Sequence, residues 1–232
     1  DTIAVNYGAG VSLADFVNKP NQERVTINNW VSDQTEEKIN NLLPDGSISP
    51  DTRMVLVNAI YFKADWQSQF DANDTSDIPF NLLNGTQVNV PMMGQGMLIL
   101  YTQGDGYTAV ELPYAGETAA MDILVPDVGR FKEIESALTS EMFNQIIGNM
   151  TETTLMLNLP KFKFESPFGL APALSQLGMV DAFDADLADF SGMTGKKDLF
   201  IGDVIHKAFV AVDEEGTEAA AATTVVMEFA SA

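Results

Sequence analysis

Near its end the chain reads Asp213-Glu214-Glu215-Gly216-Thr217-Glu218-Ala219-Ala220-Ala221-Ala222-Thr223-Thr224-Val225-Val226-Met227-Glu228-Phe229-Ala230-Ser231-Ala232. Successive residues of a strand point to opposite faces of a sheet, so a strand here would present two sets of side chains. One set carries no charge and contains Thr217, Ala219, Ala221, Thr223, Val225, Met227 and Phe229, whereas both glutamates of the run fall in the other set. This tail therefore suits a strand with one buried, uncharged face. Its small residues would let it enter between neighbouring strands without overpacking.

The same run also fits a C-terminal helix, because alanine is the best helix former. Against a helix, five of the seven residues 223–229 are β-branched or aromatic, and such residues favour strands. The pattern slightly favours a strand and leaves open a helix, or a segment able to adopt both structures.

Composition indicates a globular protein that avoids nucleic acids and anionic membranes. The 232 residues are 46% hydrophobic and 9% aromatic, enough for a sizeable core. Twelve basic and 33 acidic residues give a formal net charge of −21, which repels phosphate backbones and anionic lipids. The chain has no cysteine, and no apolar run approaches the roughly 18 residues of a membrane span. We expect no nucleic-acid partner and no membrane partner.

Hydrophobic periodicity predicts a mixture of helices and strands in a single domain, 1–232. We expect helices over 25–43, 130–150 and 170–177. We expect strands over 3–7, 88–93, 97–101, 107–112, 121–125, 153–164, 199–205 and 208–212. Residues 54–62 are nearly all apolar, which predicts a strand buried on both faces of a sheet, with Asn58 as a buried amide that needs partners. Because the chain opens in what reads as the middle of a strand, we expect residues to be missing before it.

The residues supply no active site, no metal site and no cofactor site. His206 is the only histidine, and no G-x-S-x-G motif accompanies it, so we expect a structural role for it. The aspartates between Met179 and Phe190 lack the ligand spacing of a calcium loop, and Gly94-Gln95-Gly96 lacks the third glycine of a nucleotide loop. Glycosylation sequons begin at Asn73, Asn84 and Asn149 and matter only in a secretory pathway. The sequence thus predicts a binding or inhibitory protein rather than an enzyme.

Several motifs resemble those of the serpin family, and they follow in family order along almost the whole chain. They are Val57-Asn58-Ala59-Ile60-Tyr61-Phe62-Lys63-Ala64-Asp65-Trp66, Val90-Pro91-Met92-Met93, Glu111-Leu112-Pro113-Tyr114, Leu159-Pro160-Lys161-Phe162, Ala188-Asp189-Phe190-Ser191-Gly192, His206-Lys207-Ala208-Phe209 and the hinge-like 213–222. The resemblance implies an α+β serpin fold with a large central mixed or antiparallel sheet, further sheets and packed helices. The family's opening helices and the strands after its reactive loop are absent, so we expect a partial domain that needs those segments to fold.

The resemblance also implies a suicide inhibitor of serine proteases. In that mechanism a protease attacks the exposed loop, and the cleaved loop inserts as a new strand of the central sheet. The loop hinge would be Glu214, Glu215, Gly216, Thr217, Glu218, Ala219, Ala220, Ala221 and Ala222. The family's usual loop length places the attacked bond between Ala230 and Ser231, and a small residue before the cut fits an elastase-like or subtilisin-like protease.

The remaining roles are implied by the same resemblance. Asn58 and His206 match a hydrogen-bonded pair beneath the opening of the main sheet. Lys161 and Glu214 match a salt bridge where insertion begins, and Trp66 lies near it. We expect a secreted protein, with an intracellular location left open. A non-inhibitory serpin acting as a carrier or chaperone is the alternative function.

Overall fold

A computed structural model describes residues 12–229, which group into two compact units. Among the described residues, unit 1 comprises 12–61, 165–209 and 220–229, and unit 2 comprises 62–164 and 210–219. The predicted strand over 3–7 and the predicted bond between Ala230 and Ser231 lie outside the described residues. That the chain forms one domain stays a prediction.

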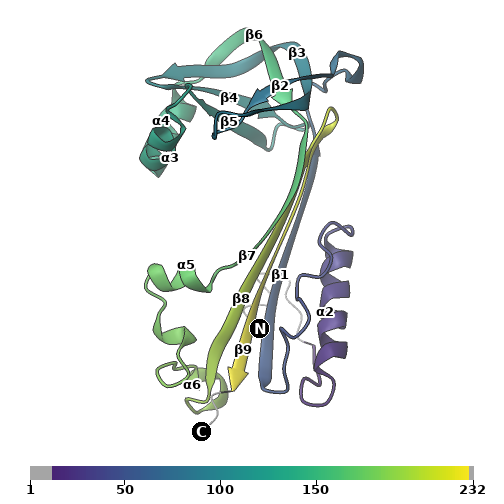
Figure 1. Cartoon of the computed structure of the whole chain (residues 1–232), viewed down its shortest axis with the longest axis vertical. Coiled ribbons are helices and arrows are strands. Elements are labelled where there is room, and N and C mark those ends of the chain that lie inside the picture. Colours follow the sequence, from purple (N-terminus) through teal and green to yellow (C-terminus); the bar gives the residue numbers. More distant parts are fainter. Residues whose placement is uncertain (1–11, 230–232) are drawn as a thin grey trace. The chain divides into compact units, whose positions relative to one another are not determined.

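The C-terminal tail is a strand, β9 (Gly216–Phe229), as the β-branched and aromatic residues predict. It lies inside a sheet of order β1-β9-β8-β7 (Figure 1), with β1 spanning Thr52–Asp65, β8 Leu199–Val212 and β7 Phe162–Gly169. The strand prediction is therefore confirmed, and the helix alternative is wrong for this conformation. The two strands predicted over 199–205 and 208–212 are one continuous strand, β8.

The more buried face of β9 is not the one that the charge pattern predicts. The described side chains with the least exposure along its middle, 0–3%, are Ala220, Ala222, Thr224 and Val226, which belong to the set that carries the glutamates. The uncharged set is fully buried only near the ends, at Thr217 and Met227, and half-buried between them. Leu43 and Ile48 pack against Val226 and help to cover this face. The glutamates lie near the two ends of the strand and leave the small residues between them free to be buried.

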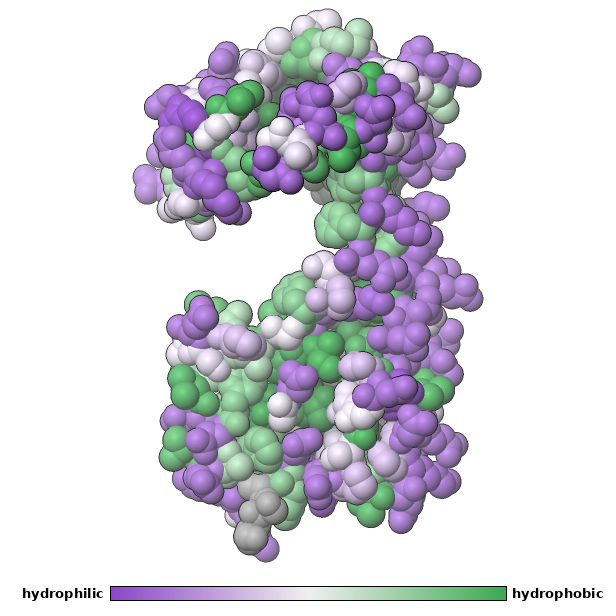
Figure 2. Space-filling model, in the orientation of Figure 1, coloured by the Kyte–Doolittle hydropathy of each residue, from purple (hydrophilic) through white to green (hydrophobic). Residues whose placement is uncertain are grey.

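Strand β1 is also less buried than its apolar sequence predicts. Burial alternates along it, and Leu56 and Ile60 are 49% and 57% exposed. Asn58 is exposed rather than buried, so its amide needs no internal partner in this structure. In Figure 2, hydrophobic surface gathers over the strands of unit 1.

The first helix of the described residues, α2 (Pro20–Gln34), begins earlier and ends earlier than the helix predicted over 25–43, and the two overlap only over 25–34. Glu36 and Glu37 have φ of 48° and 60°, a left-handed conformation that ends a helix. The side chain of Asn28 holds the following segment, accepting from the Leu43 amide at 2.8 Å and donating to the Leu43 carbonyl at 2.9 Å. Leu43 and its apolar neighbours are therefore buried without being helical.

Unit 1 also contains short helices after β7. The helix predicted over 170–177 is confirmed as α5 (Ala171–Gln176), and it is followed by η2 (Asp181–Phe183) and α6 (Ser191–Thr194). Leu170 and Leu174 pack with Val204 and Met227 in one of the hydrophobic clusters of this unit.

Unit 2 is built on an antiparallel sheet in which β2 (Ser76–Asn81), β3 (Gln87–Gly104), β4 (Tyr107–Pro113) and β5 (Ala120–Pro126) follow in order, and β6 (Thr151–Pro160) also pairs with β3. A single turn, η1 (Ala72–Asp74), precedes this sheet. The helix predicted over 130–150 is two helices, α3 (Phe131–Ala137) and α4 (Ser140–Gly148). The division falls at Thr139, whose hydroxyl accepts from the Met142 amide and begins the second helix.

Candidate functional site

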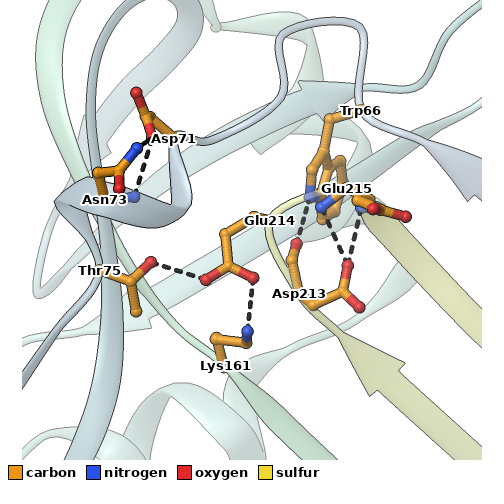
Figure 3. A network of polar contacts seen from close by, with 9 residues as sticks. Trp66, Asp71, Asn73, Thr75, Lys161, Asp213, Glu214 and Glu215 are labelled. Atoms are coloured by element: carbon orange, nitrogen blue, oxygen red, sulfur yellow. Dashed lines mark hydrogen bonds and ion pairs between the residues drawn. The ribbon is translucent and has the colours of Figure 1, made fainter.

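The carboxylate of Glu214 anchors the segment that leads into β9 (Figure 3). Lys161 Nζ lies 2.5 Å from one carboxylate oxygen, and the Thr75 hydroxyl donates to the other at 2.7 Å. The Glu214 backbone carbonyl accepts from the Phe70 amide at 3.0 Å. Only 13% of the Glu214 side chain is exposed. Lys161 and Glu214 are thus brought together as the resemblance implies.

The residues on either side of Glu214 form a tight turn against Trp66. The indole Nε1 donates to the Asp213 carbonyl at 2.9 Å, and the Trp66 amide donates to the Glu215 carbonyl at 2.8 Å. The Asp213 carboxylate accepts from the Glu215 and Gly216 amides at 3.0 and 3.2 Å. Trp66 is buried and stacks on Tyr114, with ring centroids 4.8 Å apart. Trp66 therefore contacts the loop hinge directly.

Gly216 is the first residue of β9, and backbone atoms of β1 lie where any other residue would carry its Cβ. A Cβ built at this position would overlap the carbonyl oxygen of Ala64 and lie 2.8 Å from Cα of Asp65. Backbone atoms of a paired strand cannot move aside as a flexible side chain can. The position of β9 beside β1 therefore requires glycine at position 216.

His206 is hydrogen-bonded to β9 rather than to Asn58. Its Nδ1 lies 2.7 Å from the Thr223 hydroxyl, and Phe168 lies against the ring with centroids 4.8 Å apart. Strand β9 lies between β1, which carries Asn58, and β8, which carries His206. Among the described residues, the hydrogen bond between Asn58 and His206 implied by the resemblance is absent, because β9 separates their strands and its Thr223 is the partner of His206.

Burial and hydrogen bonding act in opposite directions on Glu214. Burial raises the pKa of its carboxyl, but the hydrogen bonds from Lys161 and Thr75 lower it more, so the pKa lies below its ordinary value. The carboxylate is therefore charged at neutral pH and holds both partners.

Reversing the charge of Glu214 should loosen this hinge. In the full-length protein, Glu214→Lys places two ammonium groups together, and we expect a loss of about 1–2 kcal/mol, since Lys161 is partly exposed. The resemblance also places this salt bridge where insertion begins, so the expected result is premature insertion or polymerisation after gentle heating, measured by size-exclusion chromatography. The double variant Glu214→Lys/Lys161→Glu restores opposite charges and should recover the monomer. A single variant that stays monomeric and fully inhibitory would contradict this role.

The lowered pKa of Glu214 also predicts a pH dependence. The stability that Glu214 contributes is present above the unfolded pKa of about 4.3 and is lost as pH falls through the lower folded pKa. The destabilisation caused by Glu214→Gln should therefore be full at pH 7 and shrink in more acidic solution, as denaturant unfolding at several pH values would measure. The variant is compared with wild type at each pH because other groups also titrate. Burial and the facing Asp122 raise the pKa of Glu111, so its titration changes the stability with pH in the opposite direction. An equal difference at pH 7 and pH 3 would count against the Glu214 network.

Sequence reasoning did not find Thr75, Tyr114 and Thr223 as partners of the predicted residues. Thr75 is 139 residues from Glu214 in sequence, and a single threonine gives no signal at that separation. Tyr114 was visible only as part of the Glu111-Leu112-Pro113-Tyr114 motif, and Thr223 only as a small residue of the strand.

Across residues 12–229, no group of three or more acidic or histidine side chains is placed to hold a metal ion. In the same range no helix is long and apolar enough to cross a membrane.

Glu214 and its neighbours form an acidic turn that leads into β9, an interior strand of the four-stranded sheet. A family model described as Serpin (serine protease inhibitor) matches residues 1–232. The chain is 42% identical over 231 residues to Serpin B3 of Homo sapiens and 40% identical over 229 residues to the leukocyte elastase inhibitor of Xenopus laevis. These matches cover 97% and 96% of this chain. The chain belongs to the serpin family.

Solved structures agree with this assignment and confirm the predicted α+β serpin fold. Emu ovalbumin superposes with a TM-score of 0.94 at 32% identity, covering 99% of this chain and 60% of that protein. A loop-inserted structure of a cleaved ovalbumin mutant superposes with a TM-score of 0.93 at 31% identity, covering 98% of this chain and 61% of that one. The chain spans 59% of Serpin B3 and 61% of the leukocyte elastase inhibitor. The family description is one of protease inhibition rather than of an enzyme.

Proposed function

We propose that the full-length protein is a suicide inhibitor of serine proteases, in which residues 216–229 are the inserting part of the reactive loop. The observation that carries this proposal is the position of β9 between β1 and β8. Its sequence fits that position, because the buried residues Ala220, Ala222, Thr224 and Val226 are small or β-branched and uncharged.

The reaction begins when the protease serine oxygen attacks the carbonyl carbon of Ala230. The bond to the Ser231 nitrogen breaks, the amine leaves with a proton, and an ester joins Ala230 to the protease. The freed loop then enters the sheet from Gly216 onward, gaining backbone hydrogen bonds on both sides and burying apolar side chains. The attached protease is carried along and deformed before water can hydrolyse the ester.

The hinge residues have distinct parts in this proposal. Gly216 allows the strand to start against Ala64 and Asp65, while Glu214 and Trp66 fix the turn before it. Thr223 takes the His206 hydrogen bond in the inserted state. Asn58 is the His206 partner before insertion, so insertion replaces one hydrogen bond with another.

The target class follows from the small residue before the cut. Alanine at position 230 fits a shallow specificity pocket, as in elastase-like and subtilisin-like proteases. A relative named leukocyte elastase inhibitor, 40% identical, agrees with that choice. We place the encounter outside the cell, and in this proposal the inhibitor also uses the parts of the family's chain that the present sequence does not span.

A carrier is the second candidate. Unit 2 contains a cavity of about 900 Å³ whose lining is mainly apolar and includes Phe80, Met92, Tyr101, Met121 and Leu155. That volume lies in the range of small-molecule sites. A structure of thyroxine-binding globulin complexed with a thyroxine derivative is also similar to this chain, with a TM-score of 0.91 at 30% identity, covering 98% of this chain and 67% of that one.

A denaturing gel separates the two candidates. The full-length protein is mixed with an elastase-like protease and, separately, with a subtilisin-like protease. A band of the summed mass that survives boiling in detergent supports inhibition, because only a trapped acyl-enzyme is covalent. Clean cleavage near Ala230 without such a band contradicts inhibition and favours the carrier.

A further inference from the structure

The last described residue of the inserted strand is held by a specific contact at the start of β1. The Phe229 amide donates to the Asp51 carbonyl at 3.1 Å, and the Arg53 guanidinium carbon lies 4.8 Å from the centroid of the Phe229 ring. A guanidinium at this distance over an aromatic face is attracted by the ring and stacks on it. We call this contact of Asp51, Arg53 and Phe229 the end clamp.

The receiving side of the end clamp is ordered by its own hydrogen bonds. Arg53 Nη1 donates to the carbonyls of Pro50 and Thr52 at 2.8 and 3.1 Å, which fixes the plane of the guanidinium. The buried Thr52 hydroxyl accepts from the Ser49 amide at 3.0 Å. Because these bonds lie within residues 49–53, the turn does not need β9 for its shape. The ring of Phe229 therefore meets a preformed partner.

The end clamp also lies next to the residue through which, in the proposed mechanism, the attached protease pulls on the inserted strand. Phe229 precedes Ala230, the residue that carries the ester in the proposed mechanism. The ring is 40% exposed, so packing alone holds it weakly, and the guanidinium and the Asp51 carbonyl supply its specific contacts. The contact forms only when all of 216–229 has entered the sheet.

We propose that Arg53 is a positioning residue for inhibition: by clamping Phe229 it keeps the end of the inserted strand, and the protease attached one residue later, at the start of β1. This inference rests on the proposed function and adds a residue that acts after insertion is complete. Without the clamp, the last residues of β9 separate from the sheet. The attached protease is then deformed less, so it regains activity and hydrolyses the ester.

The test compares full-length wild type with Arg53→Ala and Arg53→Lys. Covalent complex is purified, and the return of protease activity is followed over time. We expect the complex of Arg53→Ala to decay about two- to fivefold faster, the factor that an exposed cation–π contact supports. Arg53→Lys keeps the charge but loses the planar stacking group, so its decay should lie between the other two. The matched control is Lys132→Ala, which removes an exposed cation near a different ring, Phe131, and should decay as wild type does.

A second readout does not depend on inhibition. Hydrogen exchange of the Phe229 amide is measured by NMR in the loop-cleaved full-length protein. The amide should exchange faster in Arg53→Ala, because the hydrogen bond to Asp51 then opens more often. In this readout Phe229→Leu should act like Arg53→Ala, and the double variant should add little to either single change.

The outcomes separate the clamp from the proposed function. Decay and exchange rates equal to wild type in Arg53→Ala would overturn the clamp, and faster exchange with unchanged decay would overturn its role in holding the protease. If wild type forms no covalent complex, the proposed function fails and Arg53 has no positioning role in inhibition. The exchange rates would then show only whether the contact with Phe229 exists.

Discussion

Replacing Gly216 with alanine is expected, under the proposed mechanism, to turn the full-length protein from an inhibitor into a substrate. The added Cβ would overlap the Ala64 carbonyl oxygen and crowd Asp65, both of them backbone atoms of the neighbouring strand. Overpacking of this kind costs about 1–3 kcal/mol, and more where the backbone cannot yield. Because insertion competes with hydrolysis of the acyl-enzyme, each 1.4 kcal/mol that slows it shifts the outcome about tenfold toward cleavage. Covalent complex on a denaturing gel should fall about tenfold or more, with a matching rise in cleaved protein.

The control for this change is Gly148→Ala. An added Cβ at Gly148 meets no atom within 4 Å, and this glycine lies at the end of α4 rather than in the inserting strand. Gly148→Ala should form as much complex as wild type. Undiminished complex formation by Gly216→Ala would mean that the strand does not begin against Ala64, and the insertion geometry described above would be wrong.

Ala222→Glu is expected to stop insertion part of the way along the strand. Ala222 is 1% exposed, so full insertion would bury an unpaired carboxylate. An uncompensated buried charge costs about 3–5 kcal/mol. Before cleavage the loop is outside the sheet in the proposed mechanism, so the intact variant should unfold at the same temperature as wild type. After cleavage it should gain much less thermal stability than wild type and form little covalent complex.

The same substitution at an exposed alanine provides the control. Ala137 is exposed at the end of α3, and Ala137→Glu adds an identical charge without burying it. It should leave both the complex and the stability gain unchanged. If Ala222→Glu behaved as Ala137→Glu does, position 222 would not be buried by insertion.

The sequence predicts the strand of the tail better than it predicts which face is buried. Thr223 to Phe229 contain the β-branched and aromatic residues that favour a strand, and this local signal was sufficient. Burial of Val226 depends instead on Leu43 and Ile48, which lie far away in the chain and outside any helix. Periodicity carries no information about such covering segments. The apolar run of β1 likewise gave a wrong prediction of burial on both faces, because an apolar sequence does not show whether other segments cover the strand.

A hydrogen bond or ion pair of the hinge was predictable where both of its partners lie in family-like motifs, and not elsewhere. Lys161 and Glu214 each lie in a family-like motif, and the structure joins them. Thr75 adds a second hydrogen bond to Glu214 without any motif of its own. The resemblance implied an Asn58–His206 pair beneath the opening of the main sheet, whereas here β9 separates their strands and Thr223 is the partner of His206. In the proposed mechanism one sequence serves two conformations, and the sequence alone cannot reveal which of them a given hydrogen bond belongs to.

The melting temperature of the full-length protein, measured before and after a single cut in its reactive loop, tests the insertion of residues 216–229 most directly. If cleavage frees these residues to enter the sheet, the added strand should stabilise the protein by several kcal/mol. The melting temperature should therefore rise clearly above that of the uncut protein, by several degrees or more. An unchanged or lower melting temperature after a verified cut near Ala230 would contradict insertion, and with it the proposed mechanism of inhibition.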